Sequence, residues 1–516
     1  MPSPAGPSGS LWGVSARERA PESRPELSEQ ELVRRAKRQA LLDSGVMPYP
    51  VTVPLTCSIA QVREQYPDLT TGQETDHVVG VAGRVIYLRN TGKLCFATLQ
   101  SGDGQRLQAM VSLAQVGQDS LDQFKSYVDL GDHLFVQGRV ISSKRGELSV
   151  LADAWQIASK ALRPLPVLHA DLSDEARIRD RSADLIVRQS ARDIARQRSH
   201  LVRAVREAMY RRSYDEVETP VLQTMHGGAA ARPFVTHINA YNLDLYLRIA
   251  LELFLKRALV GGMDKVFEIG KVFRNEGADS SHSPEFTMIE AYEAYGDYNT
   301  MAELTQGIIQ EAAQAVLGST TVTRSDGSEL DLGGRWTTLD LYGSVSQAVG
   351  EDINPQTTLE HLDALAQRFD LGYDPKRASH GKLVELLFEE LVAVDLVAPT
   401  FVRDFPVETS PLTRQHRTKE GVAEKWDLYI DKVELATAYS ELADPVIQRE
   451  RLEAQAALAA GGDAEAMSLD EDFLGAMEYG MPPAGGMGMG IDRLAVVLTG
   501  LGIRDITLFP IVKPLS

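Results

Sequence analysis

The stretch from Arg274 to Tyr298, RNEGADSSHSPEFTMIEAYEAYGDY, brings many polar and aromatic residues together. It contains two segments of extended type, FRNEG and HSPEFTMIEAY, joined by a polar loop. Side chains at every second position of a strand share one face. In a suitable pairing register, this face contains Arg274, Glu276, Phe286, Glu290 and Tyr292. The stretch therefore predicts a hairpin within a sheet, with a polar face that can hold a nucleotide.

The residue types on this face suit nucleotide binding. A guanidinium such as Arg274 binds a phosphate through two hydrogen bonds, a ring such as Phe286 stacks on a base, and a carboxylate such as Glu276 accepts hydrogen bonds from an exocyclic amine. A ladder of glutamate and arginine can also simply stabilise the exposed face of a sheet. That alternative explains any two of these residues, but it explains the whole set poorly.

The region around this hairpin, residues 176–516, mixes long helical patterns with strands such as KVFEIGKVFRNE and TFVRDFPVE. The strands do not alternate regularly with helices, as they would in a doubly wound fold. We therefore predict an α+β fold, in which an antiparallel sheet is flanked by helices. Residues from about 316 to 399 have a mostly helical pattern and are predicted to form an insertion in this domain.

Four segments precede this domain. Residues 1–27 are rich in Pro, Gly and Ser and predict a disordered leader. Residues 28–70 begin with serine and glutamate at capping-box spacing and predict a short helical segment. Residues 71–160 contain about five short alternating strands, which predicts a small closed β-barrel of the oligonucleotide-binding (OB) type. Residues 161–175 include the two prolines of KALRPLPVL and predict a linker.

The composition limits the classes of protein to which this chain can belong. The chain of 516 residues is 43% hydrophobic, as expected of globular domains, and has a formal net charge of −19, which does not exclude nucleic acid because only the local field at a contact surface matters. No window reaches the roughly eighteen consecutive apolar residues of a membrane-spanning helix, so no membrane partner is expected. The two cysteines, Cys57 and Cys95, are too few for a disulfide framework or a four-ligand zinc site, which favours a reducing, cytoplasmic location.

Two common enzyme signatures are missing from the sequence, the phosphate loop GxxxxGK[ST] and the zinc helix HExxH. The segment GGMGMGIDRL at 485–494 lacks the GxGxxG spacing of a dinucleotide loop. Taken alone, it predicts a close-packed turn into a helix. Asp492 and Arg493 add weight to it, because glycines let the backbone approach a ligand closely and an arginine there can cover a flat ring or reach a phosphate.

A third segment, EKWDLYIDKVELATAYSEL, has acidic residues at intervals of seven, namely Asp427, Glu434 and Glu441. Odd spacing puts Asp427 and Glu434 on opposite faces of a single strand, so a shared site requires a hairpin or a bulge. Carboxylates beside a triphosphate are natural Mg²⁺ ligands, although single acidic residues are usually solvated surface groups.

Several motifs, in order along the chain, resemble those of the class II aminoacyl-tRNA synthetases and, within them, the lysyl-tRNA synthetase family. EVETPVL with Pro220 is similar to motif 1, FRNEGADSSHSPEFTMIEAY to motif 2 and GMGMGIDRL to motif 3. Further agreement comes from GGAAARPF, LRIALELFLKR, KALRPLP, PTFVRDFP and RDITLFP. The resemblance runs from about Ser28 to the C-terminus.

The resemblance implies a binding site, residue by residue. Its ATP-binding residues would be Arg274, Glu276, His282, Phe286 and Arg493. Of these, Arg274 and Arg493 would be catalytic, with Arg274 on the α-phosphate and Arg493 stacking the adenine against Phe286. Its lysine-binding residues would be Gly228, Glu252, Glu290, Tyr292, Thr437, Tyr439 and Glu441. Its Mg²⁺ ligands would be Asp427 and Glu434, and the barrel residues reading the anticodon would be Arg84, Phe96, Gln108 and Glu147.

The implied activity is ATP-dependent conversion of L-lysine to lysyl-adenylate, followed by transfer of the lysyl group to the 3′-terminal adenosine of tRNA(Lys). Mg²⁺ would be the cofactor, ATP a substrate, and Pro220 in motif 1 implies a homodimer. Several carboxylates in one pocket suit a dibasic substrate, because a buried cation needs a counter-charge, whereas aspartate would be repelled.

Two alternatives stay open from the sequence. One is a paralogue that forms lysyl-adenylate but uses another acceptor or a lysine analogue, which the departures Thr437 and Ala438 from the family's GNGFSEL pattern would allow. The other is an inactive RNA-binding module, against which the intact motif 2 arginine counts. Leu251 also departs from the family, which usually has a proline in IAPEL, and Phe96 taken alone would be expected in the core of the barrel.

Overall fold

The computed structural model describes residues 26–166, 173–277, 282–324, 326–463 and 466–513. The chain divides into two compact units, Met1–Asp171 and Leu172–Ser516. Most of the predicted leader falls on residues 1–25 and part of the predicted linker on residues 167–172, and both segments lie outside the described residues.

The first unit begins with two helices, α1 (Glu29–Asp43) and α2 (Ile59–Gln65). Each helix starts at a capping box, in which a serine hydroxyl accepts a hydrogen bond from the N–H three residues later. In α1 the pair is Ser28 and Glu31, at the spacing seen in the sequence. The box satisfies N–H groups that the first turn of a helix leaves without partners.

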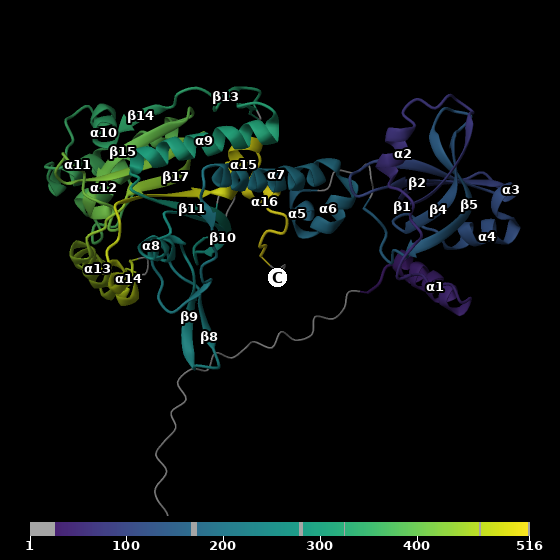
Figure 1. Ribbon diagram of the computed structural model, residues 1–516, viewed down its shortest axis with the longest axis horizontal. Helices are drawn as coiled ribbons and strands as arrows, with labels where there is room; N and C mark the ends of the chain where they lie inside the picture. Colours follow the sequence, from purple (N-terminus) through teal and green to yellow (C-terminus); the bar gives the residue numbers. More distant parts are fainter. Residues whose placement is uncertain (1–25, 167–172, 278–281, 325, 464–465, 514–516) are drawn as a thin grey trace, which may run out of the picture. The chain divides into compact units, whose positions relative to one another are not determined.

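Five strands of the first unit close into a barrel with the order β1-β2-β3-β5-β4 (Figure 1). The strands are β1 (Glu74–Asn90), β2 (Leu94–Gln100), β3 (Arg106–Ser112), β4 (His133–Ser142) and β5 (Leu148–Ser159). Between β3 and β4 lie α3 (Leu113–Val116) and α4 (Gln118–Tyr127). Alternate side chains of β2 and β3, such as Ala97, Leu99 and Val111, fill the interior. The predicted OB-type barrel is confirmed.

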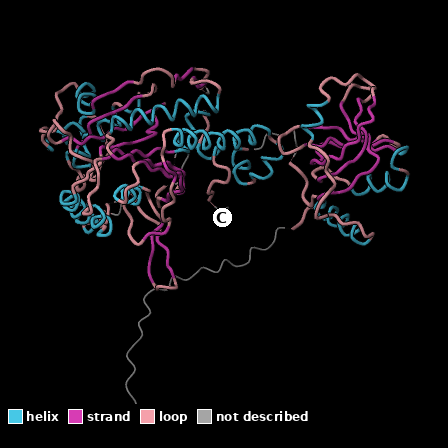
Figure 2. Tube along the Cα trace, viewed as in Figure 1, coloured by secondary structure: helices cyan, strands magenta, loops and turns pink. Residues whose placement is uncertain are grey.

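The second unit is built on an eight-stranded sheet with the order β14-β15-β16-β17-β18-β11-β10-β6 (Figure 2). The neighbouring pairs from β15 to β10 are antiparallel, and only the outermost pairs, β14 with β15 and β6 with β10, are parallel. The strands are β6 (Asp215–Glu216), β10 (Lys265–Phe273), β11 (Glu285–Ala294), β14 (Thr337–Asp340), β15 (Thr400–Pro406), β16 (Val422–Ile430), β17 (Val433–Ser440) and β18 (Ala484–Gly490). The predicted α+β class is confirmed.

Helices cover both faces of this sheet (Figure 1). Three of them, α7 (Gln189–Arg211), α9 (Tyr298–Leu317) and α15 (Ile491–Thr499), share the largest apolar core with Ile289, Trp426 and Met489 of the sheet. A second core joins α8 (Glu252–Val260) and α14 (Glu471–Met477) to Val272 and Tyr292. A third joins β15 and β16 to α10 (Leu341–Val349), α11 (Leu359–Arg368) and α12 (His380–Leu391).

Apart from α13, the remaining elements are short. The helices are α5 (Asp174–Arg179), α6 (Arg181–Val187), α13 (Pro445–Ala460), α16 (Ile503–Ile506), η1 (Ala393–Asp395) and η2 (Val407–Thr409). Two small sheets contain β7 (Leu222–Gln223), β8 (Val235–Ile238) and β9 (Leu243–Leu247), and β12 (Thr321–Thr323) and β13 (Glu329–Asp331). None of the helices in the described ranges is long and apolar enough to cross a membrane.

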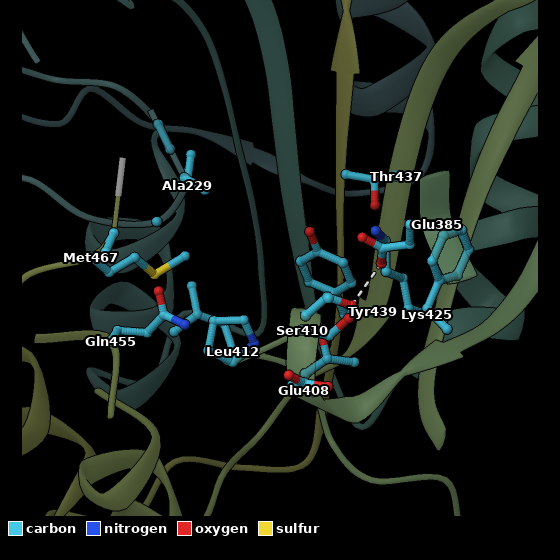
Figure 3. Close-up of a pocket in the computed structure, with 18 of the residues that line it drawn as sticks. Ala229, Glu385, Glu408, Ser410, Leu412, Lys425, Thr437, Tyr439, Gln455 and Met467 are labelled. Atoms are coloured by element: carbon cyan, nitrogen blue, oxygen red, sulfur yellow. Dashed lines mark hydrogen bonds between the residues drawn. The ribbon is translucent and has the colours of Figure 1, made fainter. Parts of the chain in front are cut away.

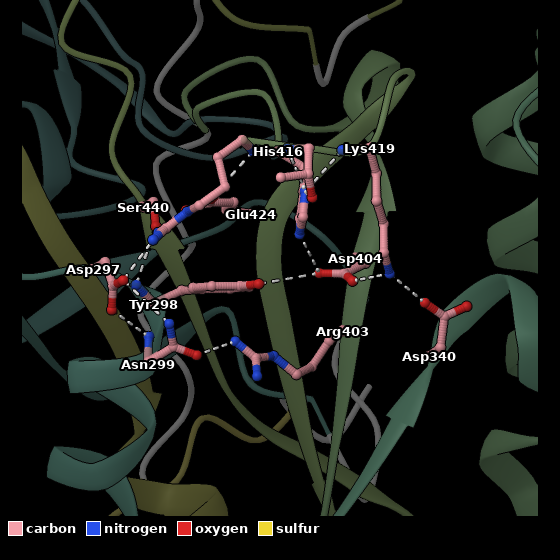
Figure 4. A network of polar contacts seen from close by, with 12 residues as sticks. Asp297, Tyr298, Asn299, Asp340, Arg403, Asp404, His416, Lys419, Glu424 and Ser440 are labelled. Atoms are coloured by element: carbon pink, nitrogen blue, oxygen red, sulfur yellow. Dashed lines mark hydrogen bonds and ion pairs between the residues drawn. The ribbon is translucent and has the colours of Figure 1, made fainter.

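A polar network holds the segment before β16 against the start of α9 (Figure 4). Arg417 pairs with Glu424 and, at 2.9 Å, with Asp297, the N-cap residue of α9. Asp404, which has a left-handed backbone (φ 69°) at a bulge of β15, pairs with Lys419. By strand alternation, Glu424 lies on the opposite face of β16 from Lys425 and Asp427, so this network stiffens the sheet from behind the face that carries the site.

Candidate active site

The motif 2 hairpin forms as the sequence predicts. Strands β10 and β11 are antiparallel, with Glu268 opposite Glu290 and Val272 opposite Phe286, and the Arg274 N–H donates to the carbonyl oxygen of Pro284 at 2.9 Å. This register brings the Arg274 guanidinium carbon to 5.2 Å from the centre of the Phe286 ring. A cation and an aromatic face, the two groups expected to bind a nucleotide, are therefore neighbours.

The glycine and methionine segment is a strand, β18, and the prediction of a turn there is wrong. Gly486 pairs with Tyr292 on one side and Tyr439 on the other, and Gly488 pairs with Glu290 and Thr437. This alternation makes room for the site, because Met487 and Met489 point into the core while the glycines leave space on the opposite face. A Cβ on Gly486 would lie 2.0 Å from Glu441 Oε1.

A cavity of about 880 Å³ opens over these strands (Figure 3). Most of the predicted ATP-, lysine- and metal-binding residues of the second unit line it, namely Gly228, Glu252, Arg274, Glu290, Tyr292, Asp427, Glu434, Thr437 and Tyr439. Gly228, with φ 84°, packs so closely on Ala250 and Glu252 that a Cβ there would lie 3.0 Å from Ala250 Cβ. A loop, a helix start and four strands therefore converge on one site.

Carboxylates gather at one part of this site. Glu290 accepts hydrogen bonds from the Tyr292 hydroxyl at 3.0 Å and from the Leu251 N–H at 2.9 Å. A proline at position 251, which the resemblance leads one to expect, would have no N–H to donate. Burial, helped by the negative charge of Glu252, raises the pKa of Glu290 to about 7. An ammonium ligand would relieve this accumulation of negative charge.

The remaining predicted lysine ligand, Glu441, is not in the wall of this cavity. Its side chain is fully buried and pairs through Oε2 with the ammonium group of Lys256, which also lies 2.6 Å from Glu252 Oε1. Glu441 Oε1 lies against Gly486 and has no hydrogen-bond partner among the described residues. Lys256 was not singled out in the sequence, where it looks like any lysine of a helix.

The β16–β17 hairpin brings the two predicted metal ligands together. The turn residues Asp431 and Lys432 both have left-handed backbones, with φ 52° and 66°. Asp427 pairs with Thr437, but beyond Leu428 the register shifts and Leu435 is left unpaired. This bulge turns Glu434 onto the face of Asp427, so the hairpin and the bulge that the odd spacing requires are both present.

The residues present fit a magnesium ion bound jointly by protein and nucleotide. Asp427 Oδ1 is buried and has no hydrogen-bond partner in the described part of the chain, while Oδ2 lies 3.1 Å from Lys425 Nζ. Burial raises the pKa of Asp427, and Lys425 opposes the rise. Within the described ranges no three metal-ligating side chains cluster as a self-sufficient site, as is common for Mg²⁺, which takes one or two carboxylates plus phosphates.

The other nucleotide residues lie around this centre. Arg493, in the first turn of α15, donates to the Glu434 carbonyl oxygen at 2.6 Å. Glu276 and His282 are exposed beside the motif 2 loop, which includes residues 278–281 outside the described part. Asp492, next to Arg493, accepts hydrogen bonds from Arg198 of α7 at 2.5 Å and from the Thr287 N–H of β11 at 2.8 Å.

Further charged residues of the cavity were missed in the sequence. Lys425 of β16, Glu385 of α12 and Glu408 of η2 line it beside Asp427. Thr409 donates to Glu385 at 2.6 Å. Alternation within β16 is a signal that could have placed Lys425 beside Asp427. No local pattern in the sequence predicts that the two glutamates belong to the site, because only the packing of α12 and η2 brings them there.

The predicted anticodon residues occupy different parts of the barrel. Phe96 and Gln108 lie on the outer face of β2 and β3, two pairs apart in the register, so Phe96 is not in the barrel core. The Arg89 guanidinium carbon lies 4.4 Å from the centre of the Phe96 ring, a neighbour the sequence reading missed. Arg84 instead donates to the Gly131 carbonyl oxygen at 2.9 Å, and Glu147 is exposed in the turn before β5.

Comparison with known proteins finds a matching family for each of the two units. Residues 173–513 match the family described as tRNA synthetases class II (D, K and N), and residues 79–158 match the OB-fold nucleic acid binding domain. A protein of Mycolicibacterium gilvum named Lysine--tRNA ligase is 61% identical over 96% of this chain and 99% of its own length. One of Kineococcus radiotolerans with the same name is 60% identical over 95% of this chain and 98% of its own.

A longer relative is also similar. The lysylphosphatidylglycerol biosynthesis bifunctional protein of Mycolicibacterium vanbaalenii is 47% identical over 96% of this chain, but the match covers only 44% of that protein. The near-complete matches in both directions, the two domain matches and the convergence of motifs 2 and 3 on one cavity give the same answer. The chain belongs to the lysyl-tRNA synthetases of the class II tRNA synthetase family.

Proposed function

We propose that the protein activates L-lysine with ATP to form lysyl-adenylate and transfers the lysyl group to the 3′-terminal adenosine of tRNA(Lys). The observation that carries this is the gathering of Glu252, Glu290 and Glu441 beside a cavity that also contains Arg274. Lysine–tRNA ligase is also the name of relatives about 60% identical over nearly the whole chain, which gives no support to a different acceptor or an inactive module.

Lysine would bind with its two ammonium groups among the carboxylates. Glu252, Glu290 and the backbone at Gly228 would receive the α-ammonium, and Glu441, with Tyr292, the side-chain ammonium. Thr437 and Tyr439 complete the wall. This charge pattern favours a dibasic amino acid and repels aspartate, because a buried cation is stable only beside a counter-charge.

ATP would bind over the motif 2 hairpin. Arg274 would hold the α-phosphate and the lysine carboxylate close enough to react, and the adenine would lie between Phe286 and Arg493, with Glu276 and His282 at its edges. A fixed guanidinium offsets negative charge that develops on the phosphoryl oxygens, and such charge stabilisation is often worth several kcal/mol of the barrier. No protein nucleophile is needed, because the lysine carboxylate attacks the α-phosphorus itself.

Asp427 and Glu434 would hold Mg²⁺ on the phosphates of ATP. The ion would neutralise phosphate charge and help pyrophosphate to leave. The buried, unpartnered Oδ1 of Asp427 supports this role. Arg493, bound to the Glu434 backbone, would keep that carboxylate beside the nucleotide.

The barrel would read the anticodon. Single-stranded loops are usually recognised by stacking bases on aromatic rings and by hydrogen bonds to their edges. Phe96, with Arg89 beside its ring and Gln108 two pairs along the same face, would supply both kinds of contact. Arg84 and Glu147 would contact the loop at other positions of the barrel.

Two further properties belong to this proposal. The chain would form a homodimer through the motif 1 region that contains Pro220, since that segment forms the subunit interface where the motif resembles class II enzymes. It would act in the cytoplasm, with which its two free cysteines, Cys57 and Cys95, are consistent.

The test is exchange of labelled pyrophosphate into ATP, measured with lysine, ornithine, aspartate or asparagine, followed by charging of tRNA(Lys). We expect exchange with lysine, its loss in Arg274→Ala, and transfer to tRNA(Lys). Exchange without charging would contradict the second step, and no exchange with any of these amino acids would contradict the whole proposal.

A further inference from the structure

The ammonium group of Lys256 sits between two of the carboxylates that define the site. It lies 2.6 Å from Glu252 Oε1, pairs with Glu441 Oε2, and donates to the Leu412 carbonyl oxygen at 3.4 Å. The Lys256 side chain is fully buried. The ammonium thus has two hydrogen-bond acceptors and, in Glu441, a second carboxylate as an ion-pair partner, which is what a buried cation needs.

The contacts of Lys256 use one oxygen of each carboxylate. The pair with Glu252 engages Oε1, and Glu252 still lines the cavity. The pair with Glu441 engages Oε2, and Oε1 has no hydrogen-bond partner among the described residues. One internal cation therefore ties both side chains in place and leaves an oxygen of Glu441 for a ligand.

The charges in this part of the site also balance only with Lys256. When ionised, Glu252, Glu290 and Glu441 carry three negative charges, and Lys256 carries one positive charge. Two negative charges are left, which equals the number of ammonium groups on lysine. Arg274 is the cation acting on Glu290, and Tyr292 and Tyr439 are further titratable groups facing these carboxylates.

We infer that Lys256 is a positioning residue for the amino-acid substrate, which fixes Glu252 and Glu441 and supplies the positive charge that favours their ionised forms, so that they receive the ammonium groups of lysine. This inference rests on the proposed function. Lys256 lies one turn of α8 after Glu252 and need not touch the substrate itself.

The titration behaviour of the cluster supports this role. Burial alone would lower the pKa of Lys256, but the two carboxylates outweigh it and raise the pKa, so the ammonium stays protonated. Burial raises the pKa of Glu252 and of Glu441, and the Lys256 ammonium opposes the rise in both. Without Lys256, both carboxylates would take up protons at a higher pH.

The test compares Lys256→Met with wild type in lysine-dependent pyrophosphate exchange from pH 6 to pH 9.5. Methionine keeps most of the side-chain volume and removes the charge. We expect the KM for lysine at pH 7 to rise at least about tenfold, with a smaller change in kcat, and to fall again toward pH 9.5 as the carboxylates ionise. Lys256→Arg, which keeps a cation, should retain the wild-type pH profile even if its KM rises.

Lys160 provides a matched control. It is also fully buried and pairs with two carboxylates, Asp129 at 2.6 Å and Asp132 at 2.8 Å, but in the barrel unit. Lys160→Met should lower the melting temperature and leave the KM for lysine and its pH profile unchanged. If Lys256→Met gives the wild-type pH profile, or alters it no more than Lys160→Met does, the inference is wrong.

A measurement on the wild type covers the case in which Lys256→Met does not fold. Calorimetric titration with lysine at pH 7, in buffers of different ionisation enthalpy, counts the protons released on binding. We expect at most one per site, from Glu290, because the Lys256 ammonium favours the ionised forms of Glu252 and Glu441. Release of more than one would overturn the inference, whereas wild type that neither binds lysine nor supports exchange would instead refute the proposed function.

Discussion

Arg198 of α7 and Asp492 of α15 form an ion pair in which the guanidinium lies 2.5 Å from the carboxylate. The second oxygen of Asp492 accepts the N–H of Thr287 on β11. One buried carboxylate therefore joins α7, the motif 2 strand β11 and the motif 3 helix α15. Arg493, the proposed adenine ligand, is the next residue along the chain.

Asp492→Ala should therefore affect both stability and nucleotide binding. Removing one partner of a buried pair leaves the other unpaired, and we expect a loss of about 2–4 kcal/mol in the free energy of unfolding together with a higher KM for ATP. Urea unfolding and pyrophosphate exchange measure the two effects. Asp193→Ala is the control. It removes the carboxylate of an exposed ion pair with Arg196 on α7, the helix of Arg198, and should change neither the free energy of unfolding nor the KM for ATP. Equal losses in both variants would contradict the prediction.

Gly486→Ala should abolish most lysine activation. The added methyl group would meet Glu441 Oε1 at 2.0 Å and the Tyr292 ring at 2.4 Å, and neither buried group can move away freely. We expect kcat/KM for lysine in the exchange reaction to fall at least about 100-fold, a loss of about 3 kcal/mol. Gly488→Ala is the matched control, because its methyl group would meet the flexible end of Met288 at 3.3 Å and Glu290 Cγ at 3.6 Å, an ordinary van der Waals distance. A smaller fall in kcat/KM for Gly486→Ala than for Gly488→Ala would contradict this description of the site.

Lysine binding should weaken as the pH falls through about 7, the pKa to which burial and Glu252 raise Glu290. Below this pH Glu290 is neutral and attracts an ammonium group less, so the KM for lysine should rise. The folded state also holds this proton more tightly than the unfolded chain, so Glu290 costs stability above pH 7 and this cost disappears toward pH 4.5. Glu290→Gln should remove both dependences. An unchanged pH profile in Glu290→Gln would show that another group titrates.

Phe96→Ala and Arg89→Ala should weaken tRNA charging and leave pyrophosphate exchange unchanged. Loss of one stacked base typically costs about 1–3 kcal/mol, which corresponds to a roughly 5- to 150-fold higher KM for tRNA(Lys). The exchange reaction needs no tRNA and serves as the control within each variant. A parallel fall in exchange would mean that the substitutions disturb folding and not recognition.

Much of the fold could be predicted because its signals are local. The capping box at Ser28, the alternating strands of the barrel and the two halves of motif 2 are each decided by residues close in sequence. Strand β18 was misread because glycine has a low strand propensity, and its alternation of glycine with methionine has meaning only between β11 and β17. Tertiary pairing there overrides local preference.

The site was predictable in part for the same reason. Glu252 and Lys256 are one helical turn apart and could have been paired from spacing, but the contact of Lys256 with Glu441 joins segments far apart in the chain. Arg89 was likewise visible in the sequence, but its position over Phe96 depends on the register of β1 and β2. Composition and spacing therefore indicate which residues belong to the site, whereas strand pairing and tertiary packing decide which residues they contact.

The unpaired Leu435 decides which face of the sheet Glu434 occupies. Without this bulge, regular alternation would place Glu434, two residues before Ala436, on the face of Ala436 and Ala438, inside the apolar core and away from Asp427. The number of residues between Glu434 and Thr437, the partner of Asp427, is therefore as important as the identity of the acidic residue. Side chains along this hairpin can change one at a time, but an insertion or deletion here also removes or rebuilds the bulge.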